Sequence, residues 1–387
     1  MTPRSPFLAG LIFAVLTPGP AAGGQSAVAT ADSLVRAFMT AHRIPAVSVA
    51  VADSTGIVYR GTYGFADVEN RVPATPETLF RIASVTKPLT AAGVLRLVDT
   101  GRLDLDAPIQ TYCPAFPAKR WPVTARMLMA HTGGLRDYTR VERGVWLVET
   151  AGGRQRGSST VHLTSVDEAV AVFAADPLVS EPGTVHRYSN WGYVLLGCAI
   201  EGASGRSYES YMADELFDVL GMTRTRSNDA YTIIENRARA YQMRTEATKD
   251  FWWFIPEQKR AMAVGELYNA RFEDTSHKLP AGGMLSTAVE LARFGAGVVH
   301  GDFLAPATRA EMMTEQRTRA GDPTGWTLGW SVGNGVVGLR GAQPGVTAQL
   351  TTVPSAGLTV AIVANRDLVP TGDLFRELAA AWGVDLP

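Results

Sequence analysis

The chain has 387 residues and a formal net charge of −1, because 36 Lys and Arg residues nearly balance 37 Asp and Glu residues. A hydrophobic content of 46% is enough for a large buried core and excludes an intrinsically disordered chain. No dense run of Lys or Arg is present to supply the counterion release that drives nucleic-acid binding, so we exclude nucleic acid as a partner.

Residues 1–29 have the pattern of a secretory signal peptide. Arg4 precedes an apolar run of ten residues, Phe7 to Leu16, and the helix-breaking Pro18 and Pro20 follow that run. The run is half of the roughly 20 residues that a helix needs to span a bilayer, and no later stretch is long and apolar enough either. We therefore expect an exported protein, periplasmic or secreted, without a transmembrane segment.

The first elements predicted after this segment are a helix and a hairpin. Thr30 to His42 carries apolar residues at helical spacing, which predicts a helix. Ala46 to Ala52 and Gly56 to Tyr63 have the β-branched, alternating character of strands, and the turn residues Asp53 to Gly56 join them.

Helical patterns separated by Gly- and Pro-rich loops fill the middle of the chain. They cover Ser84 to Thr100, Ala125 to Ala130, Val166 to Ala174, Asn190 to Ala203, Tyr208 to Leu220 and Thr287 to Val299. The segment Ala151 to Thr160 is low in apolar residues and is predicted to be a mobile surface loop.

The C-terminal region again has the pattern of a sheet. Strands are predicted at Trp326 to Val332, Gly335 to Leu339, Thr347 to Val353 and Leu358 to Ala364, before an amphipathic helix at Asp373 to Trp382. Strands at both ends predict an α/β fold, in which one antiparallel sheet built from both chain ends is flanked by helices. We expect residues 30–80 and 326–387 to form this sheet domain, and residues 81–325 to form an inserted, mainly helical domain.

The chain has two cysteines, Cys113 and Cys198. Neither follows the apolar run near the N-terminus as the lipid-bearing cysteine of a lipoprotein would. Two cysteines are too few for a disulfide framework, which leaves two alternatives. Either they form a single bridge, or Cys198 is a buried thiol, because it lies in the apolar run Tyr193 to Ile200.

The first motif that carries chemistry is Arg81-Ile-Ala-Ser84-Val-Thr-Lys87-Pro88. Pro88 indicates that a helix begins near Ser84, because proline is tolerated in a first helical turn. The free N–H groups and the positive dipole end at that position can stabilise an oxyanion. Lys87 shares a face with Ser84 and can take its proton only if burial and nearby positive charge lower the lysine pKa from about 10.4 toward roughly 7. We therefore expect a largely desolvated Lys87.

S-x-x-K alone is too short a pattern to be specific, and a second motif supplies the specificity. Glu181-Pro-Gly183-Thr-Val-His-Arg-Tyr188-Ser-Asn190 is a Pro-Gly turn that delivers Tyr188 and Asn190 just before an apolar helix. The ordered pair S-x-x-K and Y-S-N resembles the serine β-lactamase, D,D-peptidase and esterase superfamily. Supporting phrases are Leu128-Met-Ala-His131-Thr-Gly-Gly-Leu135, Leu220-Gly-Met-Thr-Arg224 and Pro280-Ala-Gly-Gly-Met-Leu-Ser286-Thr.

Within that superfamily, the stretch from Tyr112 to His131 and the phrase Asn236-Arg-Ala-Arg-Ala-Tyr241 are most similar to β-lactamase-like serine proteins whose animal members are mitochondrial. The resemblance implies a β-lactamase/transpeptidase-like fold with its active site where the two domains meet, and no cofactor. It also implies an acyl-enzyme mechanism in which Ser84 attacks a carbonyl and Lys87 and Tyr188 move the proton. Tyr188 must then lie within hydrogen-bond reach of both Ser84 and Lys87.

The same resemblance gives Asn190 the task of holding the substrate or Lys87. The family's third motif, a Lys or His followed by Ser or Thr and Gly, is expected before Pro344, where the chain reads Leu339-Arg340-Gly341-Ala342. The cationic position is Leu339, and only Gly341 matches by identity. This departure puts the recognition of a β-lactam carboxylate in doubt.

The backbone of this motif can still bind an oxyanion without that cation. The N–H groups of Ser84 and Ala342 are the predicted oxyanion hole. Gly341 and Arg340 are predicted substrate contacts. Arg340 either replaces the lost cation or is a solvent-facing charge, because neighbouring residues of a strand point to opposite faces.

Other patterns are better explained by structure. His131-Thr-Gly133 is similar to the third motif, but it precedes Tyr188 and follows a helix, so we interpret it as a helix-ending turn. Gly333-Asn-Gly335-Val-Val-Gly338 fits G-x-G-x-x-G, yet Asn334-Gly335 is a hairpin signal and no helix follows. The six histidines lack metal-ligand spacing, which predicts no metal site. The aromatic cluster Phe251-Trp-Trp-Phe254 either lines an acyl pocket or, as we favour, packs a subdomain.

The sequence thus predicts an exported serine hydrolase that cleaves a small ester, amide or peptide through a Ser84 acyl-enzyme. The enzymatic alternative is a β-lactamase or D,D-carboxypeptidase. The non-enzymatic alternative is a penicillin-binding-like assembly protein. Leu339 favours the esterase or peptidase reading over the lactamase, and no motif defines an oligomeric state.

Overall fold

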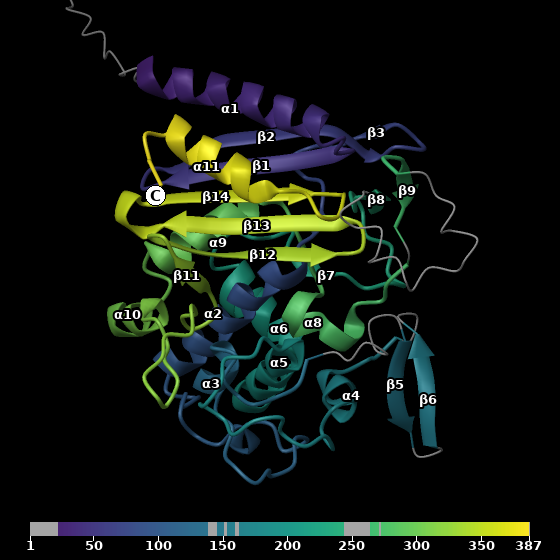
Figure 1. Cartoon of the computed structure of the whole chain (residues 1–387), viewed down its shortest axis with the longest axis vertical. Coiled ribbons are helices and arrows are strands. Elements are labelled where there is room, and N and C mark those ends of the chain that lie inside the picture. The colour runs from purple at the N-terminus through teal and green to yellow at the C-terminus, as the bar shows by residue number, and fades with distance from the viewer. Residues whose placement is uncertain are drawn as a thin grey trace, which may run out of the picture.

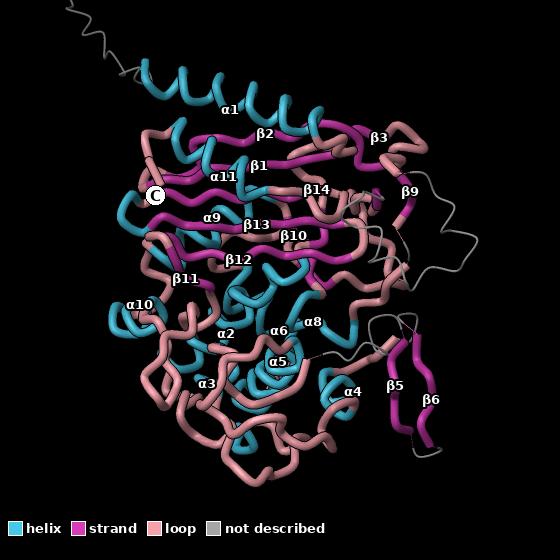
Figure 2. Tube along the Cα trace, in the orientation of Figure 1, coloured by secondary structure: helices cyan, strands magenta, loops and turns pink. Residues whose placement is uncertain are grey.

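A computed structural model describes residues 22–137, 145–150, 153–158, 162–243, 264–270 and 272–386. In Figure 1 the strands of one sheet lie in the upper half of the molecule, and helices and loops make up most of the lower half. Colouring by secondary structure makes the same division clear (Figure 2).

The main sheet is antiparallel and is built from both ends of the chain. Within the described ranges its strand order is β11-β12-β13-β14-β1-β2-β3. The first strand of the chain is paired with the last, and Val49 lies opposite Ile362 in the register. The strands are β1 (Ala46–Asp53), β2 (Gly56–Asp67), β3 (Val72–Pro73), β11 (Ser331–Gly333), β12 (Val336–Gln343), β13 (Val346–Val353) and β14 (Leu358–Ala364).

Helices cover both faces of this sheet. Helices α1 (Ala22–Ala41) and α11 (Thr371–Ala381) lie side by side on one face, and α9 (Ala288–Val299) packs on the other. Alternate residues of β1 therefore belong to two cores. Val47, Val49 and Val51 pack in the core under α1 and α11, whereas Ala50 and Ala52 belong to the larger core on the α9 side.

The helical half of the molecule is organised around α5, which is buried along most of its length because its residues are apolar on nearly every side. Helix α2 packs on it and contains Lys87 of the S-x-x-K motif, whose Ser84 lies in the turn before the helix. The helices are α2 (Thr86–Asp99), α3 (Ala125–Met129), α4 (Val166–Ala171), α5 (Asn190–Ser204), α6 (Tyr208–Met212), α8 (Leu279–Gly282) and α10 (Pro306–Met313).

The remaining described strands are short and form three small sheets. β4 (Phe80–Arg81), β10 (Met284–Ser286) and β7 (Arg226–Ser227) form a separate small sheet. β5 (Val145–Thr150) pairs with β6 (Gly153–Ser158), and β8 (Tyr241–Met243) pairs with β9 (Leu267–Asn269).

The predicted antiparallel sheet from both chain ends, flanked by helices, is confirmed. Within the predicted loop Ala151 to Thr160, the described residues Gly153–Ser158 are instead the strand β6, which pairs with β5. The low apolar content of this segment gave no sign of a strand. The strand predicted from Trp326 shrinks to Ser331–Gly333. Gly329 interrupts the extended chain with a φ of 103°. The predicted helix at Tyr208 to Leu220 is α6 followed by a wider helical turn, Ala213–Phe217.

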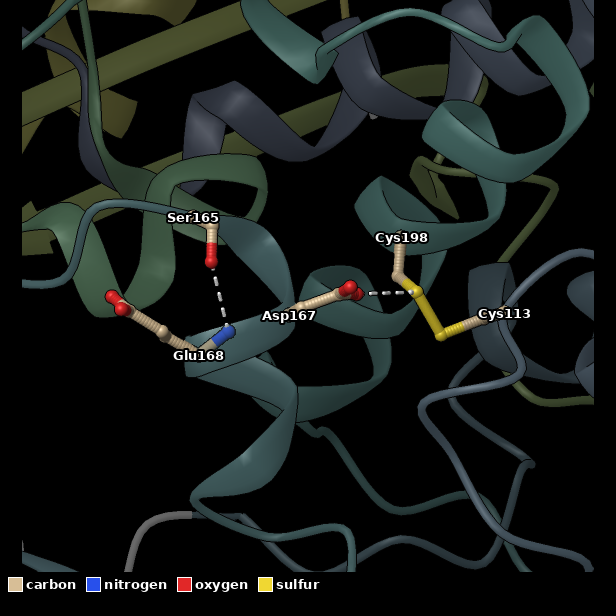
Figure 3. Close-up of a disulfide and its surroundings, with 5 residues drawn as sticks. All are labelled: Cys113, Ser165, Asp167, Glu168 and Cys198. Atoms are coloured by element: carbon tan, nitrogen blue, oxygen red, sulfur yellow. Dashed lines mark hydrogen bonds between the residues drawn. A yellow bond between two sulfur atoms is a disulfide. The ribbon is translucent and has the colours of Figure 1, made fainter. Parts of the chain in front are cut away.

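Cys113 and Cys198 form a disulfide, so the bridge is the correct alternative and a free thiol is not (Figure 3). Cys198 lies on α5, and both residues are buried. Asp167 of α4 approaches the bridge, with its Oδ1 3.5 Å from Cys198 Sγ. The bond closes a loop of 85 residues.

None of the helices in the described ranges combines the length and apolarity that a bilayer span needs. Most of the predicted signal peptide, residues 1–21, lies outside the described residues, and α1 begins at Ala22, within the predicted segment. The aromatic cluster at Phe251 to Phe254 also lies outside the described residues.

Candidate active site

Ser84 lies between a short strand and a long helix. After β4 the chain enters a 3₁₀ turn, Ala83–Val85, that leads directly into α2. Ala83 has a φ of 48°, which is unfavourable for a residue with a Cβ and persists only where the surroundings hold it. Ser84 is half-buried at the N-terminal end of α2, as the position of Pro88 predicted.

Lys87 is fully buried and makes three close polar contacts. Its Nζ donates to Asn190 Oδ1 and to the Ala281 carbonyl oxygen, each at 2.7 Å, and lies 3.3 Å from Ser84 Oγ. A neutral amine has two N–H groups and one lone pair. With both N–H groups engaged by oxygen acceptors, the lone pair is left for the hydroxyl proton of Ser84.

The electrostatic environment brings the pKa of Lys87 close to neutrality. Burial lowers this pKa to about 7, the Asp137 carboxylate opposes the shift and Lys278 adds to it. The expected desolvation of Lys87 is therefore confirmed.

Tyr188 forms a hydrogen bond with Ser84, as predicted, but its contact with Lys87 is made by the face of its ring and not by its hydroxyl. Its hydroxyl donates to Ser84 Oγ at 2.9 Å, whereas Lys87 Nζ lies 4.8 Å from the centroid of its ring. Burial raises the pKa of the Tyr188 phenol above its ordinary value, despite the opposing effect of the bond to Ser84. Tyr188 is thus a neutral phenol that donates to Ser84 at neutral pH.

Asn190 is the first residue of α5 and lies between a carboxylate and Lys87. The Ser189 hydroxyl caps the helix by accepting from the Gly192 N–H. The side-chain Nδ2 and the backbone N–H of Asn190 both donate to Asp137 Oδ1 at 3.0 Å. These bonds turn Asn190 Oδ1 toward Lys87.

Asp137 was not predicted from the sequence. The available signal was its place in Leu135-Arg-Asp137, directly after a phrase that supports the family resemblance. Ala281 was likewise missed, because a backbone carbonyl acceptor leaves no mark in a sequence.

The strand β12 lies against the backbone of Ser84. A Cβ placed on Gly341 would be 2.4 Å from the Ile82 carbonyl oxygen and 2.9 Å from the Ser84 nitrogen, so only glycine allows this approach. Alternation along the strand places Leu339 and Gln343 on the same face as Gly341. The Gln343 amide donates to the Gly282 carbonyl of α8 at 2.6 Å.

Arg340 is exposed on the opposite face of the sheet, which favours the second of the two alternatives for this residue, a solvent-facing charge. Its guanidinium lies 3.4 Å from the Val369 carbonyl oxygen, near the start of α11. It borders a cavity of about 380 Å³ on that face, together with Gly372 and Phe375. The physical reason is the alternation of side chains, which sends Arg340 away from the face that carries Gly341.

A buried ion cluster adjoins the site through α8. Lys278 Nζ lies 2.6 Å from Glu273 Oε1, and Arg81 Nη1 lies 4.0 Å from Glu273 Oε2. Burial raises the pKa of Glu273, but Lys278 and Arg81 outweigh this effect and bring it to about 2. Lys278 directly precedes α8, whose Ala281 carbonyl accepts from Lys87. The cluster was not predicted from the sequence, and the charge of Lys278 contributes to the lowered pKa of Lys87.

The described residues contain no group of three or more His, Cys, Asp and Glu side chains that could hold a metal ion. The hydrogen bonds to Ser84 and the pKa values of Lys87 and Tyr188 form a setting in which a hydroxyl can act as a nucleophile. The adjacent lysine is poised near neutral pH, and the adjacent phenol is a proton donor.

The chain is similar in sequence to known proteins of one family. A family model described as Beta-lactamase matches residues 31–381. The mitochondrial serine beta-lactamase-like protein LACTB of Mus musculus is 29% identical over 348 residues, which covers 74% of this chain and 60% of that protein. Esterase EstB of Burkholderia gladioli is 35% identical over 211 residues, which covers 51% of this chain and half of the esterase. The chain thus spans only part of the length of these relatives.

A solved structure supports the fold. The D-amino acid amidase of Ochrobactrum anthropi SV3, complexed with L-phenylalanine, superposes with a TM-score of 0.73 at 24% sequence identity. The superposition covers 93% of this chain and 98% of the amidase. At this identity the likeness shows a shared fold.

Proposed function

The chain belongs to the Beta-lactamase family of serine hydrolases, and from that premise we propose that it hydrolyses an ester or an amide through an acyl-enzyme at Ser84. The observation that carries the proposal is the position of the Ser84 hydroxyl between Lys87 and Tyr188. Ser84 Oγ lies 3.3 Å from Lys87 Nζ and accepts a hydrogen bond from Tyr188 at 2.9 Å. A serine is a poor nucleophile until a base takes its proton, and a lysine with a pKa of about 7 is such a base near neutral pH.

In acylation, Ser84 Oγ forms a bond to the substrate carbonyl carbon while its proton passes to Lys87 Nζ. The N–H groups of Ser84 and Ala342 hold the oxyanion that forms on the carbonyl oxygen. The carbonyl then re-forms, and the bond to the leaving alkoxide or amine breaks. Tyr188 gives its phenolic proton to that leaving group, and the proton held by Lys87 restores the phenol.

Deacylation repeats these steps with water as the nucleophile. A water gives a proton to Lys87 Nζ as its oxygen forms a bond to the carbonyl carbon of the Ser84 ester. The bond from that carbon to Ser84 Oγ then breaks, Ser84 Oγ takes the proton back from Lys87, and the acid product leaves. Both half-reactions therefore use Lys87 as the base.

We assign Asn190 to holding Lys87 instead of the substrate. Its amide oxygen is used by Lys87, and its amide nitrogen is used by Asp137. Gly341 remains the proposed substrate contact of the third motif, through its backbone and that of the neighbouring Ala342.

The proposed substrate class follows from Leu339. Recognition of the carboxylate of a β-lactam or of a peptide C-terminus calls for a cation in the third motif. Leu339 is apolar and only 7% exposed, and Arg340 lies on the other face of the sheet. An uncharged acyl donor, such as a simple ester or a peptide-like amide, fits this site better.

We further propose that the protein is exported. The pattern of residues 1–29 motivates this proposal, and the bridge between Cys113 and Cys198 supports it, because structural disulfides persist in oxidising compartments. N-terminal sequencing of the protein secreted by a bacterial host tests the proposal. A mature protein that begins between Pro20 and Thr30 is expected, and a cytosolic protein that starts at Met1 would contradict it.

The decisive experiment is labelling of the intact chain with a fluorophosphonate and with a fluorescent penicillin, followed by mass mapping of the adduct. We expect a fluorophosphonate adduct on Ser84, cleavage of p-nitrophenyl esters, and loss of both in Ser84→Ala. An adduct on any other residue overturns the mechanism. Turnover of a chromogenic cephalosporin that disappears in Ser84→Ala would support the β-lactamase alternative instead.

The non-catalytic alternative predicts no adduct and no ester cleavage with either reagent. It also predicts that Ser84→Ala leaves any self-assembly unchanged, which size-exclusion chromatography measures. An inactive wild-type chain that assembles normally would therefore contradict the proposed hydrolase function.

A further inference from the structure

His131 contacts three consecutive residues around Tyr188 in three separate ways. Its carbonyl oxygen accepts from the Arg187 N–H at 2.8 Å, and its Nδ1 accepts from the Ser189 N–H at 3.2 Å. Its ring lies 4.3 Å from the Tyr188 ring, centroid to centroid, at an interplanar angle of 34°. We propose that His131 is a positioning residue that holds the phenol of Tyr188 against Ser84. This inference rests on the proposed function, because that function gives Tyr188 its role.

Tyr188 needs such support because its own segment has no regular structure. Residues 185–189 form neither helix nor strand before α5 begins at Asn190. His131, in contrast, lies in a hydrogen-bonded turn just after α3. Its N–H donates to the Leu128 carbonyl at 3.2 Å, its φ is 57°, and its side chain is buried. The predicted helix-ending turn is therefore present, and its imidazole also reaches the site.

The bond to Ser189 defines the protonation state of the imidazole. Nδ1 can accept only when it carries no proton, so the ring is neutral with its proton on Nε2. The titratable groups that face this ring are Lys87 of α2, His186 and Tyr188 of the loop, and Tyr193 of α5. Burial lowers the pKa of His131 well below its usual value, and Lys87 and His186 lower it further.

A ring that merely filled space would be better apolar. Nε2 of His131 is buried and makes no hydrogen bond to any residue in the described part of the chain. An unpaired buried donor carries a free-energy cost that phenylalanine would avoid. The acceptor at Nδ1 is what a histidine contributes here that a phenylalanine cannot.

Two variants separate the ring from the acceptor. His131→Phe keeps a ring against Tyr188 but leaves the Ser189 N–H without its acceptor. His131→Asn removes the ring but places an amide oxygen near the position of Nδ1. His186→Phe is the matched control, because His186 stacks on Trp326 and its ring centroid lies 6.0 Å from that of His131.

For His131→Phe we expect amide exchange at Ser189 to accelerate at least tenfold. We also expect kcat for a p-nitrophenyl ester to fall about 10- to 100-fold with KM changed less than threefold, because a misplaced catalytic group costs rate without weakening binding. His131→Asn should restore most of the protection of the Ser189 amide. His186→Phe should stay within about twofold of wild type in both measurements.

A His131→Phe variant with wild-type Ser189 exchange and wild-type kcat overturns the proposal. If that variant does not fold, loss of Ser189 protection in the folded His131→Asn overturns it instead, because the amide oxygen should preserve the bond. The two proposals fail in different ways. A wild-type chain that is not labelled at Ser84 contradicts the hydrolase function, whereas exchange at Ser189 still decides whether His131 holds this segment.

Discussion

Asp137 and Asn190 are joined by two hydrogen bonds that meet on one oxygen. The backbone N–H and the side-chain Nδ2 of Asn190 both donate to Asp137 Oδ1 at 3.0 Å. The pairing fixes the amide of Asn190 with its oxygen toward Lys87, which donates to it at 2.7 Å. A carboxylate outside both sequence motifs therefore controls how Lys87 is held.

The first prediction concerns this carboxylate. Asp137→Asn removes the negative charge that raises the pKa of Lys87, so this pKa should fall below about 7. The acidic limb of the pH profile of kcat/KM should move to lower pH, because Lys87 then stays neutral to a lower pH. The plateau rate should drop about tenfold as the Asn190 amide loses its fixed orientation. An acidic limb that stays in place, or that moves to higher pH, contradicts the assignment of this limb to Lys87.

A second prediction links Lys87 to stability. Its pKa is lowered from 10.5 to about 7 in the folded chain, so the unfolded chain binds more protons between these values and stability rises with pH across this window. Lys87→Met should abolish this rise, which amounts to roughly 3 to 5 kcal/mol, and should be more stable than wild type at pH 6. Urea unfolding of both proteins at pH 6 and pH 10 measures the difference. The same variant should lose acylation by at least about 100-fold.

The third prediction tests the approach of β12 to the nucleophile. Gly341→Ala places a Cβ 2.4 Å from the Ile82 carbonyl oxygen, so β12 must move away from Ser84. Fluorophosphonate labelling of Ser84 should slow about 100-fold, because a displacement of this kind misplaces the oxyanion donors. Gly333→Ala is the control, since no atom lies within 4 Å of the Cβ it would add. Equal labelling rates for the two variants would remove β12 from the proposed oxyanion hole.

The fourth prediction concerns the disulfide. The bridge between Cys113 and Cys198 closes a loop of 85 residues, and the loss of such a cross-link should reduce the free energy of unfolding by about 4 kcal/mol. The double variant with alanine at both positions, and the wild type in reductant, should unfold at the same lower urea concentration. Ester cleavage at 25 °C should be kept, because neither cysteine belongs to the candidate site. A stability that does not respond to reductant would contradict a structural role.

Much of the site was predictable because its chemistry is local in sequence. Ser84 and Lys87 share one turn at the start of α2, and Tyr188 and Asn190 lie two residues apart before α5. A helix start and a Pro-Gly turn are short-range features, so residue spacing is enough to propose them. The antiparallel sheet from both chain ends was predictable in the same way from alternating strands at the two termini.

The remaining features depend on contacts between distant segments. The face occupied by Arg340 was left open, because it follows from the register with β13 and from the position of α11. The pairing of Cys113 with Cys198 was open because two cysteines have no partner until the fold brings them together. The β5–β6 pairing was missed because β6, Gly153–Ser158, has no large apolar residue, although β5 contains the apolar run Val145 to Val148.

Sequence alone was enough to propose Ser84 as the nucleophile with Lys87 and Tyr188 beside it, because each is marked by a residue type at a fixed spacing from a helix start. The tertiary structure decided the pKa of Lys87, which depends on burial and on Asp137 and Lys278 from other parts of the chain. It also decided that His131 reaches Tyr188 and that Arg340 does not reach Ser84. The burial of a side chain, the charges around it and the direction in which it points depend on residues from distant segments, which come together only when the chain folds.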